Sequence, residues 1–423
     1  MNVSVSCKEP LGEVTVIPSK SVAHRVIISA ALSDEPTEIV CKASSRDIEA
    51  TLDCVSALGA KVERRGGSIF ITPQKGEGRA RLDCAECGST LRFLIPVAAT
   101  LPREIELCGS GRLSERPILP LLECLSANGA EFSYSGTLPF TMRGGLRCGT
   151  FRIAGDISSQ FISGLIFALP TLSGDSVVEI EGKLESSKYI DMTIDAVSAF
   201  GIKVERNGNT IKIRGNQKYT SPKKVVIEGD WSNAAFWAVL GAFSKEGITC
   251  RGVNNKSLQG DRAILEILKK FGAGVEVQED FFTVRKGSLC ACDIDAAEIP
   301  DLVPVLSVLA AVSEGETRIY NAYRLRIKES DRIETTVAMI NALGGDARVE
   351  GDDIFIRGKK TLSGGCVNAE NDHRIAMSAA VAAAVCGGTV EIIGAEAVNK
   401  SYGNFYEEYE KLGANLKKSE EEK

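Results

Sequence analysis

The sequence predicts an α/β fold built from six similar units, because one pattern recurs at nearly equal intervals. In this pattern an amphipathic helix ends at a glycine and a β-rich segment follows, as in residues 51–72. The intervals are 70, 72, 71, 72 and 69 residues between Gly59, Gly129, Gly201, Gly272, Gly344 and Gly413. Each glycine is expected to have a positive φ, which ends a helix without steric penalty. Six such units exceed one ordinary core, so two domains of three units are expected.

A second helix precedes each of these helices, so the predicted unit is strand, helix, strand, helix and hairpin. It is expected about 35 residues before each glycine, near Val22, Thr90, Phe161, Ala234, Leu302 and Ile375. Asn207-Gly208 predicts a type I′ hairpin turn, and Gly66-Gly67 and Gly351-Asp352 occupy the matching places in two other units. The sixth unit is expected to end in the charged tail after Leu416.

The composition excludes several classes of protein. With 44% hydrophobic and 25% charged residues among 423, the chain is expected to be a soluble globular protein. Its formal charge of −6 argues against nucleic-acid binding, although a pocket of cations can still bind small anions. The N-terminus lacks a signal-peptide pattern, and the longest apolar stretch, 376–386, is too short to span a membrane. We therefore expect a cytoplasmic protein without a membrane or nucleic-acid partner, and a monomer.

The thirteen cysteines are an odd number spread over a long chain, so reduced thiols are expected. Cys84 and Cys87 form one CxxC pair, which suits a redox role or half of a zinc site. The sequence has no second CxxC pair, and His24 and His373 are its only histidines. We therefore expect no metal, and we interpret His24, inside an apolar helix, as a packing residue.

Cations mark the predicted helix starts. Serine and aspartate at such positions are explained as N-caps, but a cation there opposes the helix dipole. Any one of these cations alone is more simply explained as a solvated surface residue. Eight at equivalent places predict instead a site for a ligand with several negative charges. They are Lys20, Arg25, Arg92, Arg116, Lys328, Arg332, Arg374 and Lys400.

Two carboxylates and a histidine near these cations are candidates for proton transfer. Glu329 lies between two of the cations in the sequence and can hold them in place or move a proton. Asp301 begins a helix after a proline, where a simple cap explains it equally well. His373 shares a helix start with Arg374, although an isolated histidine is more often structural. The sequence contains no P-loop and no dinucleotide-binding glycine motif.

At these residues, and along essentially its whole length, the chain resembles the EPSP synthase family, which is the target of the herbicide glyphosate. The matching segments are modest signals singly, but their order and spacing are highly specific. They are PSKSVAHR (18–25), ECGSTLRF (86–93), SERPI (114–118), GDISSQF (155–161), SSKYIDMT (186–193), EGDWSNAAF (228–236), IPDL (299–302), RIKESDR (326–332), NDHR (371–374) and NKSYGNF (399–405).

The resemblance implies a fold and a domain division. The implied fold has two lobes of three βαβαββ units, described as an inside-out α/β barrel, with helix N-termini facing a central cleft. The chain would cross between the lobes near Pro18 and Gly229. Residues 1–18 and 230–423 would then form one lobe, and residues 19–229 the other.

The resemblance also implies two substrate sites and a reaction. Shikimate 3-phosphate is expected at Lys20, Ser21, Arg25, Ser158, Ser159, Gln160, Ser186, Asp301 and Lys328. Phosphoenolpyruvate is expected at Lys20, Gly88, Arg116, Gln160, Arg332, Arg374 and Lys400. The implied reaction transfers the enolpyruvyl group to the 5-hydroxyl by addition and elimination, on the shikimate pathway to chorismate and the aromatic amino acids. Asp301 is expected as the base, Glu329 and Lys20 as proton carriers and His373 as support, without a metal or organic cofactor.

Three positions depart from the family pattern. Phe93 stands in place of a common proline, and Glu86 in place of a common asparagine. Arg324 also replaces an asparagine, so it is left out of the predicted site.

Two alternative functions stay open. UDP-N-acetylglucosamine enolpyruvyltransferases share the implied fold and chemistry, but they have Lys-Asn where this chain has Lys20-Ser21. They also carry a cysteine in the loop that corresponds to residues 113–117, which have none. A non-catalytic binder of phosphorylated metabolites would not need Asp301, Glu329 and Lys20 together.

Overall fold

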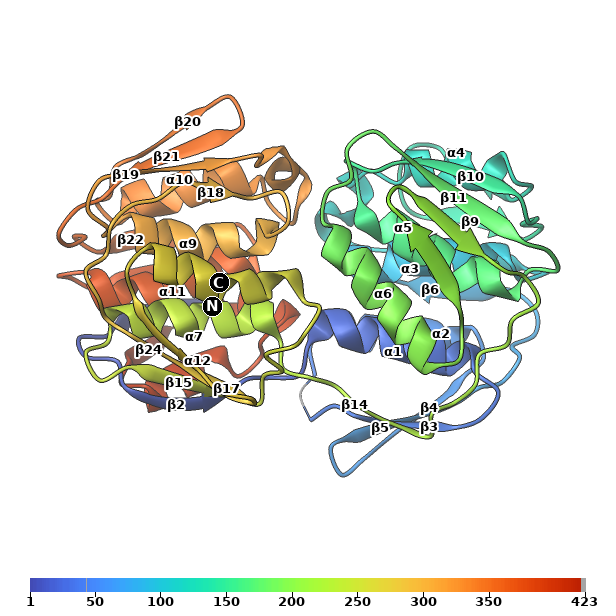
Figure 1. Ribbon diagram of the computed structural model, residues 1–423, viewed down its shortest axis with the longest axis horizontal. Helices are drawn as coiled ribbons and strands as arrows, with labels where there is room; N and C mark the ends of the chain where they lie inside the picture. The colour runs from blue at the N-terminus through green and yellow to red at the C-terminus, as the bar shows by residue number, and fades with distance from the viewer. Residues whose placement is uncertain (43, 420–423) are drawn as a thin grey trace. The chain divides into compact units, whose positions relative to one another are not determined.

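The chain forms two compact units in a computed structural model that describes residues 1–42 and 44–419 (Figure 1). Unit 1 contains Met1–Ile17 and Glu228–Lys423, and unit 2 contains Pro18–Ile227. The expected division placed the crossings one or two residues further along the chain. Among the described residues, no helix has the length and apolar character to cross a membrane.

Unit 2 consists of three repeats, each with two helices and a four-stranded sheet. The first has α1 (Lys20–Leu32), α2 (Arg46–Ala57) and the sheet β14-β3-β5-β4, with strands Lys224–Val226, Thr37–Val40, Ser68–Thr72 and Lys61–Arg65. The second has α3 (Gly88–Ala99), α4 (Leu119–Ser126) and the sheet β6-β7-β9-β8, with strands Ala80–Asp83, Glu104–Cys108, Phe140–Arg143 and Glu131–Ser133. The third has α5 (Ser159–Ala168), α6 (Ser187–Ala199) and the sheet β10-β11-β13-β12, with strands Thr150–Ala154, Ser176–Glu181, Thr210–Ile213 and Val204–Asn207.

Unit 1 repeats the same plan three times. The fourth repeat has α7 (Trp231–Phe243), α8 (Ile264–Lys270) and the sheet β16-β17-β15-β2, with strands Gly274–Val277, Phe281–Arg285, Ile248–Arg251 and Gly12–Thr15. The fifth has α9 (Val303–Ala310), α10 (Arg332–Ala342) and the sheet β18-β19-β21-β20, with strands Ile294–Asp295, Glu316–Tyr320, Asp353–Arg357 and Ala347–Glu350. The sixth has α11 (His373–Ala382), α12 (Phe405–Lys411) and the sheet β22-β23-β1-β24, with strands Gly365–Asn368, Val390–Ile393, Asn2–Ser6 and Asn415–Ser419.

The sixth sheet corrects the expectation that its repeat ends after Leu416. β24 continues to Ser419 and pairs antiparallel with β1, which also pairs antiparallel with β23. In this sheet β1 therefore occupies the position that the second strand of a hairpin occupies in the other repeats. This pairing joins residues more than 380 positions apart, for example Asn2 with Ser419, so no local pattern could show it.

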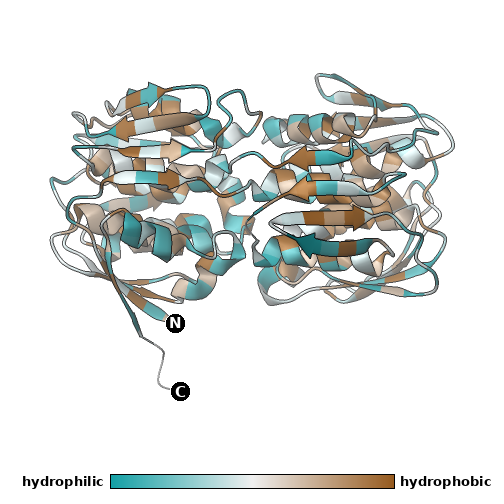
Figure 2. Ribbon diagram, turned by 90° about the horizontal axis from the view of Figure 1, so that it is seen from below, coloured by the Kyte–Doolittle hydropathy of each residue, from teal (hydrophilic) through white to brown (hydrophobic). Residues whose placement is uncertain are grey.

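The helices of each unit lie inside, and the sheets lie outside them (Figures 1 and 2). Helices α7, α9 and α11 are buried along nearly their whole length and belong to one hydrophobic core with the strands of unit 1. A separate core joins α1, α3 and α5 to the strands of unit 2. Alternate strand residues point into these cores, as in β19, where Thr317 and Ile319 are buried while Glu316 and Arg318 are exposed. The predicted α/β fold of six repeats is confirmed.

The six glycines that set the repeat are confirmed as helix stops. Their φ values are 120°, 101°, 81°, 92°, 84° and 100° in chain order. The N–H of Gly59 donates to Ser56 O at 2.8 Å, and the N–H of Ala60 donates to Val55 O at 3.1 Å. The other five positions form the same pair of bonds, which occupy carbonyls that the helix end would otherwise leave open.

Two of the three predicted hairpin loops are confirmed and one is corrected. Glu350 pairs with Asp353, so Gly351-Asp352 forms a loop as predicted. Gly66 and Gly67 have φ of 57° and 83°, as a type I′ turn requires. At the second hairpin, Asn207 pairs with Thr210, so the loop is Gly208-Asn209 and the predicted turn at Asn207-Gly208 is wrong. Gly208 has φ 58°, while neither asparagine is among the described residues with positive φ. A glycine at the first loop position favours the II′ geometry, which needs positive φ only there.

Candidate active site

In unit 1 the first turns of the helices lie together. The Nε of Arg332, at the start of α10, donates to Asp372 Oδ2 at 2.7 Å, and Asp372 is the N-cap of α11. Arg374 reaches from α11 to the carbonyl of Ser232 in the first turn of α7, with Nη1 3.0 Å from the oxygen. Lys400 Nζ donates to Asn371 O at 2.7 Å. The positive ends of several helix dipoles therefore adjoin one cluster of cations.

Asp301 is the acceptor at the centre of this cluster. Its Oδ1 accepts from Arg332 Nη1 at 2.8 Å and lies 3.4 Å from Lys328 Nζ, while Oδ2 lies 3.5 Å from Arg374 Nη2. Although burial opposes ionisation, these three cations hold the pKa of Asp301 well below its usual range. The short 3₁₀ turn Pro300–Leu302 has no side-chain cap, so the alternative that Asp301 is a simple cap is wrong.

Arg332 connects three carboxylates although only 1% of its side chain is exposed. Besides Asp301 and Asp372, it donates through Nη2 to Glu329 Oε2 at 2.8 Å. Burial opposes the charge of Arg332, but the carboxylates raise its pKa above the ordinary value. The guanidinium is thus a fixed positive centre, and it holds Glu329 in one orientation.

The pKa of Lys328 is shifted in the opposite direction to that of Arg332. Burial, helped by the charges of Arg332 and Arg324, lowers the pKa of Lys328 to about 8 in spite of the attraction of Asp301. Arg324, one of the departures from the family pattern, is itself only 8% exposed. An additional anion in this cluster would favour the charged form of Lys328, so the cluster is suited to a negatively charged ligand.

Asp261 is a buried carboxylate beside the cluster that sequence analysis overlooked. Its Oδ2 accepts from Ser232 Oγ, and only 2% of the residue is exposed. Burial, with the negative charge of Asp301, raises the pKa of Asp261 to about 7. The folded protein therefore keeps a proton on Asp261 over a pH range in which the unfolded chain has lost it.

This proton predicts a pH-dependent effect of Asp261→Asn. Between about pH 4 and pH 7 the unfolded state loses the proton and the folded state does not, so ionisation increasingly favours unfolding. We expect Asp261→Asn to raise the free energy of unfolding relative to wild type by up to about 4 kcal/mol more at pH 8 than at pH 4. Both tryptophans, Trp231 and Trp237, belong to unit 1, so urea unfolding followed by tryptophan fluorescence measures this effect. The exposed control, Asp346→Asn, should show no such pH difference.

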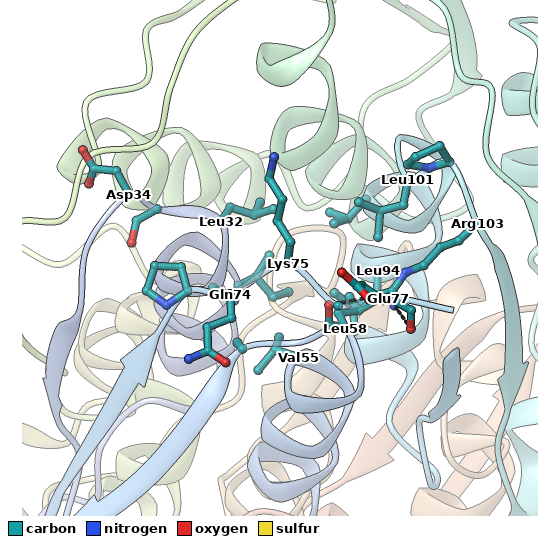
Figure 3. Close-up of a pocket in the computed structure, with 18 of the residues that line it drawn as sticks. Leu32, Asp34, Val55, Leu58, Gln74, Lys75, Glu77, Leu94, Leu101 and Arg103 are labelled. Atoms are coloured by element: carbon teal, nitrogen blue, oxygen red, sulfur yellow. Dashed lines mark hydrogen bonds between the residues drawn. The ribbon is translucent and has the colours of Figure 1, made fainter. Parts of the chain in front are cut away.

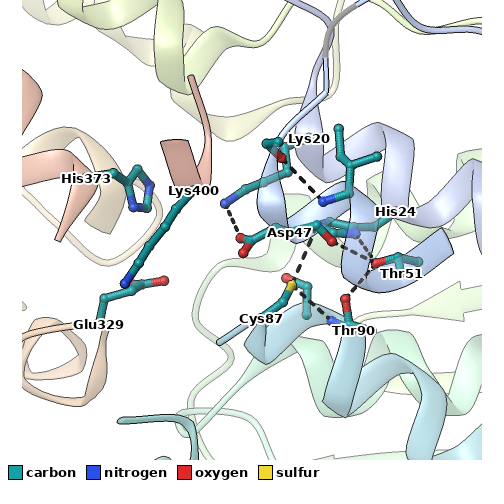
Figure 4. A network of polar contacts seen from close by, with 12 residues as sticks. Lys20, His24, Asp47, Thr51, Cys87, Thr90, Glu329, His373 and Lys400 are labelled. Atoms are coloured by element: carbon teal, nitrogen blue, oxygen red, sulfur yellow. Dashed lines mark hydrogen bonds and ion pairs between the residues drawn. The ribbon is translucent and has the colours of Figure 1, made fainter. Parts of the chain in front are cut away.

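The helix starts of unit 2 form a second cluster. Lys20 Nζ, in the first turn of α1, donates to Asp47 Oδ2 at 2.7 Å (Figure 4). Gln160, in the first turn of α5, accepts from Arg92 Nη1 at 2.8 Å and donates to Ser89 Oγ at 2.8 Å. These contacts join the N-terminal turns of α1 to α2 and of α5 to α3.

Arg25 is held on three sides. Its Nε donates to Thr193 Oγ1 at 2.8 Å, and its two Nη atoms donate to the carbonyls of Ser21 and Tyr189 at 2.6 and 3.0 Å. The guanidinium lies over the ring of Phe93, 5.0 Å from its centroid. Phe93, which departs from the family pattern, is therefore a packing partner of a predicted site residue.

Gly88 and Arg116 are neighbours in space. A methyl group at Gly88 would come within 2.7 Å of Arg116 Nη1, so only a residue without a side chain leaves the guanidinium in this place. Gly88 is also the first residue of α3, where backbone N–H groups are available to an anion.

The remaining predicted residues have the following positions. Ser158 caps α5 by accepting from the N–H of Gln160 at 3.3 Å, and Ser159 beside it is buried. Ser186 precedes α6 with a left-handed φ of 54°. His373 begins α11 with Nδ1 3.9 Å from Asp372 Oδ1 (Figure 4 shows it with Glu329 and Lys400).

Burial decides between the two explanations of the cations. Relative exposures of 2%, 4%, 1%, 3% and 4% contradict a solvated surface role for Arg25, Arg92, Arg332, Arg374 and Lys400. Buried cations are stabilised by specific partners, and most of the partners here lie at or near helix N-termini. The explanation as solvated surface residues is therefore wrong for these five cations.

Sequence analysis missed three carboxylates of the two clusters. Asp47 holds Lys20, Asp372 holds Arg332, and Asp261 contacts Ser232. Arg92, one of the predicted cations, holds Gln160. Asp47 and Asp372 were visible only as residues at helix starts, where capping explains an aspartate. Their ion pairs span 27 and 40 residues, so the contacts themselves depend on the fold.

A large cavity of about 800 Å³ in unit 2 is not part of these clusters (Figure 3). It is lined mainly by apolar residues at the C-terminal ends of α1, α2 and α3, such as Leu32, Leu58 and Leu101. Helix C-termini disfavour anions, so we place the candidate site at the N-terminal ends in spite of the size of this cavity.

Solved structures identify the class of protein. An EPSP synthase from Acinetobacter baumannii is 25% identical, with a TM-score of 0.82 over 99% of this chain and 100% of that chain. The enolpyruvyl transferase NikO from Streptomyces tendae shares the fold at 17% identity, with a TM-score of 0.80 over 98% of each chain. The fold is therefore that of the enolpyruvyl transferases.

Sequence comparison defines the family within this class. The model of the family EPSP synthase (3-phosphoshikimate 1-carboxyvinyltransferase) matches residues 8–409. The 3-phosphoshikimate 1-carboxyvinyltransferase of Clostridium kluyveri is 44% identical over 98% of both chains, and that of Clostridium acetobutylicum is 43% identical over 96% of both. The chain belongs to the EPSP synthase family, and the expected membership is confirmed.

Proposed function

We propose that the chain transfers the enolpyruvyl group of phosphoenolpyruvate to the 5-hydroxyl of shikimate 3-phosphate, with release of phosphate. The observation that carries this proposal is the cluster at Asp301, where a carboxylate capable of taking a hydroxyl proton is surrounded by three buried or half-buried cations. Both substrates are anionic, so the cations can bind their phosphate and carboxylate groups directly. The residues of both units are proposed to act on this one pair of substrates, as family membership implies.

Asp301 is proposed to orient the 5-hydroxyl and accept its proton. In the ligand-free protein Lys328, Arg332 and Arg374 keep Asp301 ionised but make it a weak base. Substrate phosphate and carboxylate groups would share these cations, so the pKa of Asp301 would rise toward the value that suits a general base. The base would thus become effective only when substrates are bound.

Glu329 and Lys20 are proposed to carry the protons of the addition and elimination steps. C3 of phosphoenolpyruvate gains a proton as the hydroxyl oxygen bonds to C2, and loses one as phosphate departs. Glu329 is fixed by Arg332 at 2.8 Å, and Lys20 is fixed by Asp47 at 2.7 Å, so both have the defined orientation that proton transfer requires. His373 is proposed to support Glu329, and Lys400, Arg116 and Gly88 to hold phosphoenolpyruvate.

Gly88→Ala is expected to weaken phosphoenolpyruvate binding about tenfold or more and shikimate 3-phosphate binding little. The added methyl group would displace the Arg116 guanidinium, 2.7 Å away, and keep an anion from the first turn of α3. Separate titrations of the variant with each substrate measure the effect.

Gly274→Ala is the matched control, because a methyl group there meets only ordinary contacts at 3.7 Å. Equal losses for both substrates in Gly88→Ala would show general damage to the unit. Unchanged phosphoenolpyruvate binding would show that Gly88 only begins a helix.

Phosphate release by the purified protein with both substrates tests the proposed function. Release with a UDP-amino sugar in place of shikimate 3-phosphate would favour the related enolpyruvyltransferase, and no release at all would favour a non-catalytic binder. We further propose a cytoplasmic monomer, which cell fractionation and analytical ultracentrifugation test.

A further inference from the structure

We propose that His24, Asp47 and Cys87 form a binding site for a soft divalent cation such as Zn²⁺ or Cd²⁺. The three residues come from the first turns of α1 and α2 and from the N-cap of α3, all in unit 2. Imidazole, carboxylate and thiol are the ligand types that zinc prefers. None of the three residues is itself a predicted substrate residue, although Cys87 precedes Gly88 and Asp47 contacts Lys20.

The distances suit a tetrahedral ion. The Sγ of Cys87 lies 3.8 Å from Nε2 of His24, and one ligand atom from each of the three residues lies within 4.8 Å of the others. Tetrahedral zinc with these ligand types separates its donor atoms by about 3.4 to 3.6 Å. The donor atoms lie somewhat farther apart than in a tetrahedral site, and side-chain rotations that bring them closer would close the site around an ion (Figure 4 shows the three side chains).

The imidazole is already oriented for the ion. Nδ1 of His24 is 2.7 Å from Thr51 Oγ1, which in turn lies 2.6 Å from Thr90 Oγ1. A histidine ligand commonly donates its second ring N–H to such a partner, which fixes the ring and leaves the other nitrogen for the metal. In this arrangement Nε2 points toward Cys87.

The protonation states of His24 and Cys87 determine whether a metal ion must displace a proton when it binds. Burial lowers the pKa of His24 to about 3, so the imidazole is neutral at pH 7 and ready to coordinate. Burial, with the charge of Asp47, raises the pKa of Cys87 to about 12, so its thiol is protonated. Coordination replaces the S–H bond with a bond from sulfur to the ion and releases one proton to solvent.

Coordination also competes with Lys20 for Asp47. The Lys20 ammonium lies 2.7 Å from Asp47 Oδ2, where a bound dication would repel it. A dication with one thiolate, one carboxylate and a neutral imidazole is electrically balanced, so Lys20 would have to leave. The expected result is loss of turnover, an effect that rests on the proposed role of Lys20, whereas metal binding itself does not.

The CxxC pair does not explain the cluster. Cys84 turns toward Leu82 O, 4.0 Å from its sulfur, and contacts Cys54 instead of His24. Cys87 also accepts from Thr90 N at 3.4 Å as the N-cap of α3, a role that serine fills at least as well. Cys87→Ser therefore removes the soft ligand and keeps the cap.

Titration of the reduced full chain with Cd²⁺ tests the site through the near-ultraviolet absorption of cadmium-bound thiolate and equilibrium dialysis. We expect one Cd²⁺ ion to bind with this absorption in wild type, and Cys87→Ser and His24→Asn each to lose about tenfold or more in affinity. Cys84→Ser should bind like wild type, as should a variant with serine at the exposed Cys148, Cys290 and Cys366. Affinity equal to wild type in Cys87→Ser, or an equal loss in Cys84→Ser, would overturn the proposal.

Two further measurements distinguish a failure of the metal-site proposal from a failure of the proposed function. Cd²⁺ should raise the urea midpoint of wild type but not that of Cys87→Ser, which also shows that the variant is folded. Cd²⁺ should inhibit wild-type phosphate release, while the activity of Cys87→Ser, whatever its level, should be insensitive. Binding without inhibition would contradict the role of Lys20 and leave the metal site intact, and inhibition that persists in Cys87→Ser would contradict the metal site.

Discussion

Glu329→Gln is expected to reduce turnover about a hundredfold or more, the usual contribution of a general acid or base. The carboxylate is held by Arg332 at 2.8 Å, and an amide oxygen can accept the same hydrogen bond, so the local structure should persist. Only the ability to give and retake a proton is lost. Both substrates should therefore still bind, because their cations remain in place.

Steady-state phosphate release and substrate titrations measure the two effects separately. The control is Glu334→Gln in the first turn of α10, which removes an exposed carboxylate paired with Arg326 and should leave turnover unchanged. A decrease of less than about threefold in Glu329→Gln would exclude the proton-transfer role. A matched loss of binding and turnover would mean that Glu329 only positions the cations.

Arg332→Met is expected to lower the free energy of unfolding of unit 1 by about 3 to 5 kcal/mol. The substitution leaves Asp301, Glu329 and Asp372 together without the cation that connects them. Asp372 is fully buried, so water cannot solvate its negative charge once the guanidinium is removed. Removal of one partner from a buried ion network is more damaging than removal of both.

A double-mutant cycle with Asp372→Asn tests this explanation. The asparagine oxygen can still cap α11 by accepting from Arg374 N, so the second substitution mainly removes charge. The double variant should recover part of the stability, as measured by urea unfolding and the fluorescence of the two tryptophans of unit 1. Additive losses would mean that Arg332 stabilises the fold by packing and not by pairing with Asp372.

Features that depend on local sequence were predictable, and those that depend on distant contacts were not. A helix that ends at Gly59 needs only a local positive φ, and the spacing of such glycines was sufficient to give six repeats. The turn at Asn207-Gly208 was misplaced by one residue because register is set by pairing across the strands. The role of β1 in the sixth sheet was missed for the same reason, since its partners lie near the other end of the chain.

The candidate site shows the same limit. Residue types and helix starts pointed to Asp301, Glu329 and the cations, because charges of that kind are unfavourable there without a ligand. They did not show that His24 has polar partners at both ring nitrogens, although its burial was expected. A packing interpretation follows from apolar neighbours along one helix, whereas Thr51 and Cys87 approach from two others.

The strand at the start of the chain is among the last to find its place. Ribosomes make β1 first, but its partners β23 and β24 leave the ribosome only when residues 390–419 have been made. Unit 2 is one continuous segment, so it can form its core before residues 1–17 have paired with the rest of unit 1. Loop closure between β1 and these strands spans most of the chain and is slow, so the sixth sheet should form after the core of unit 2. Until then the apolar residues at alternate positions of β1 lack their partner strands.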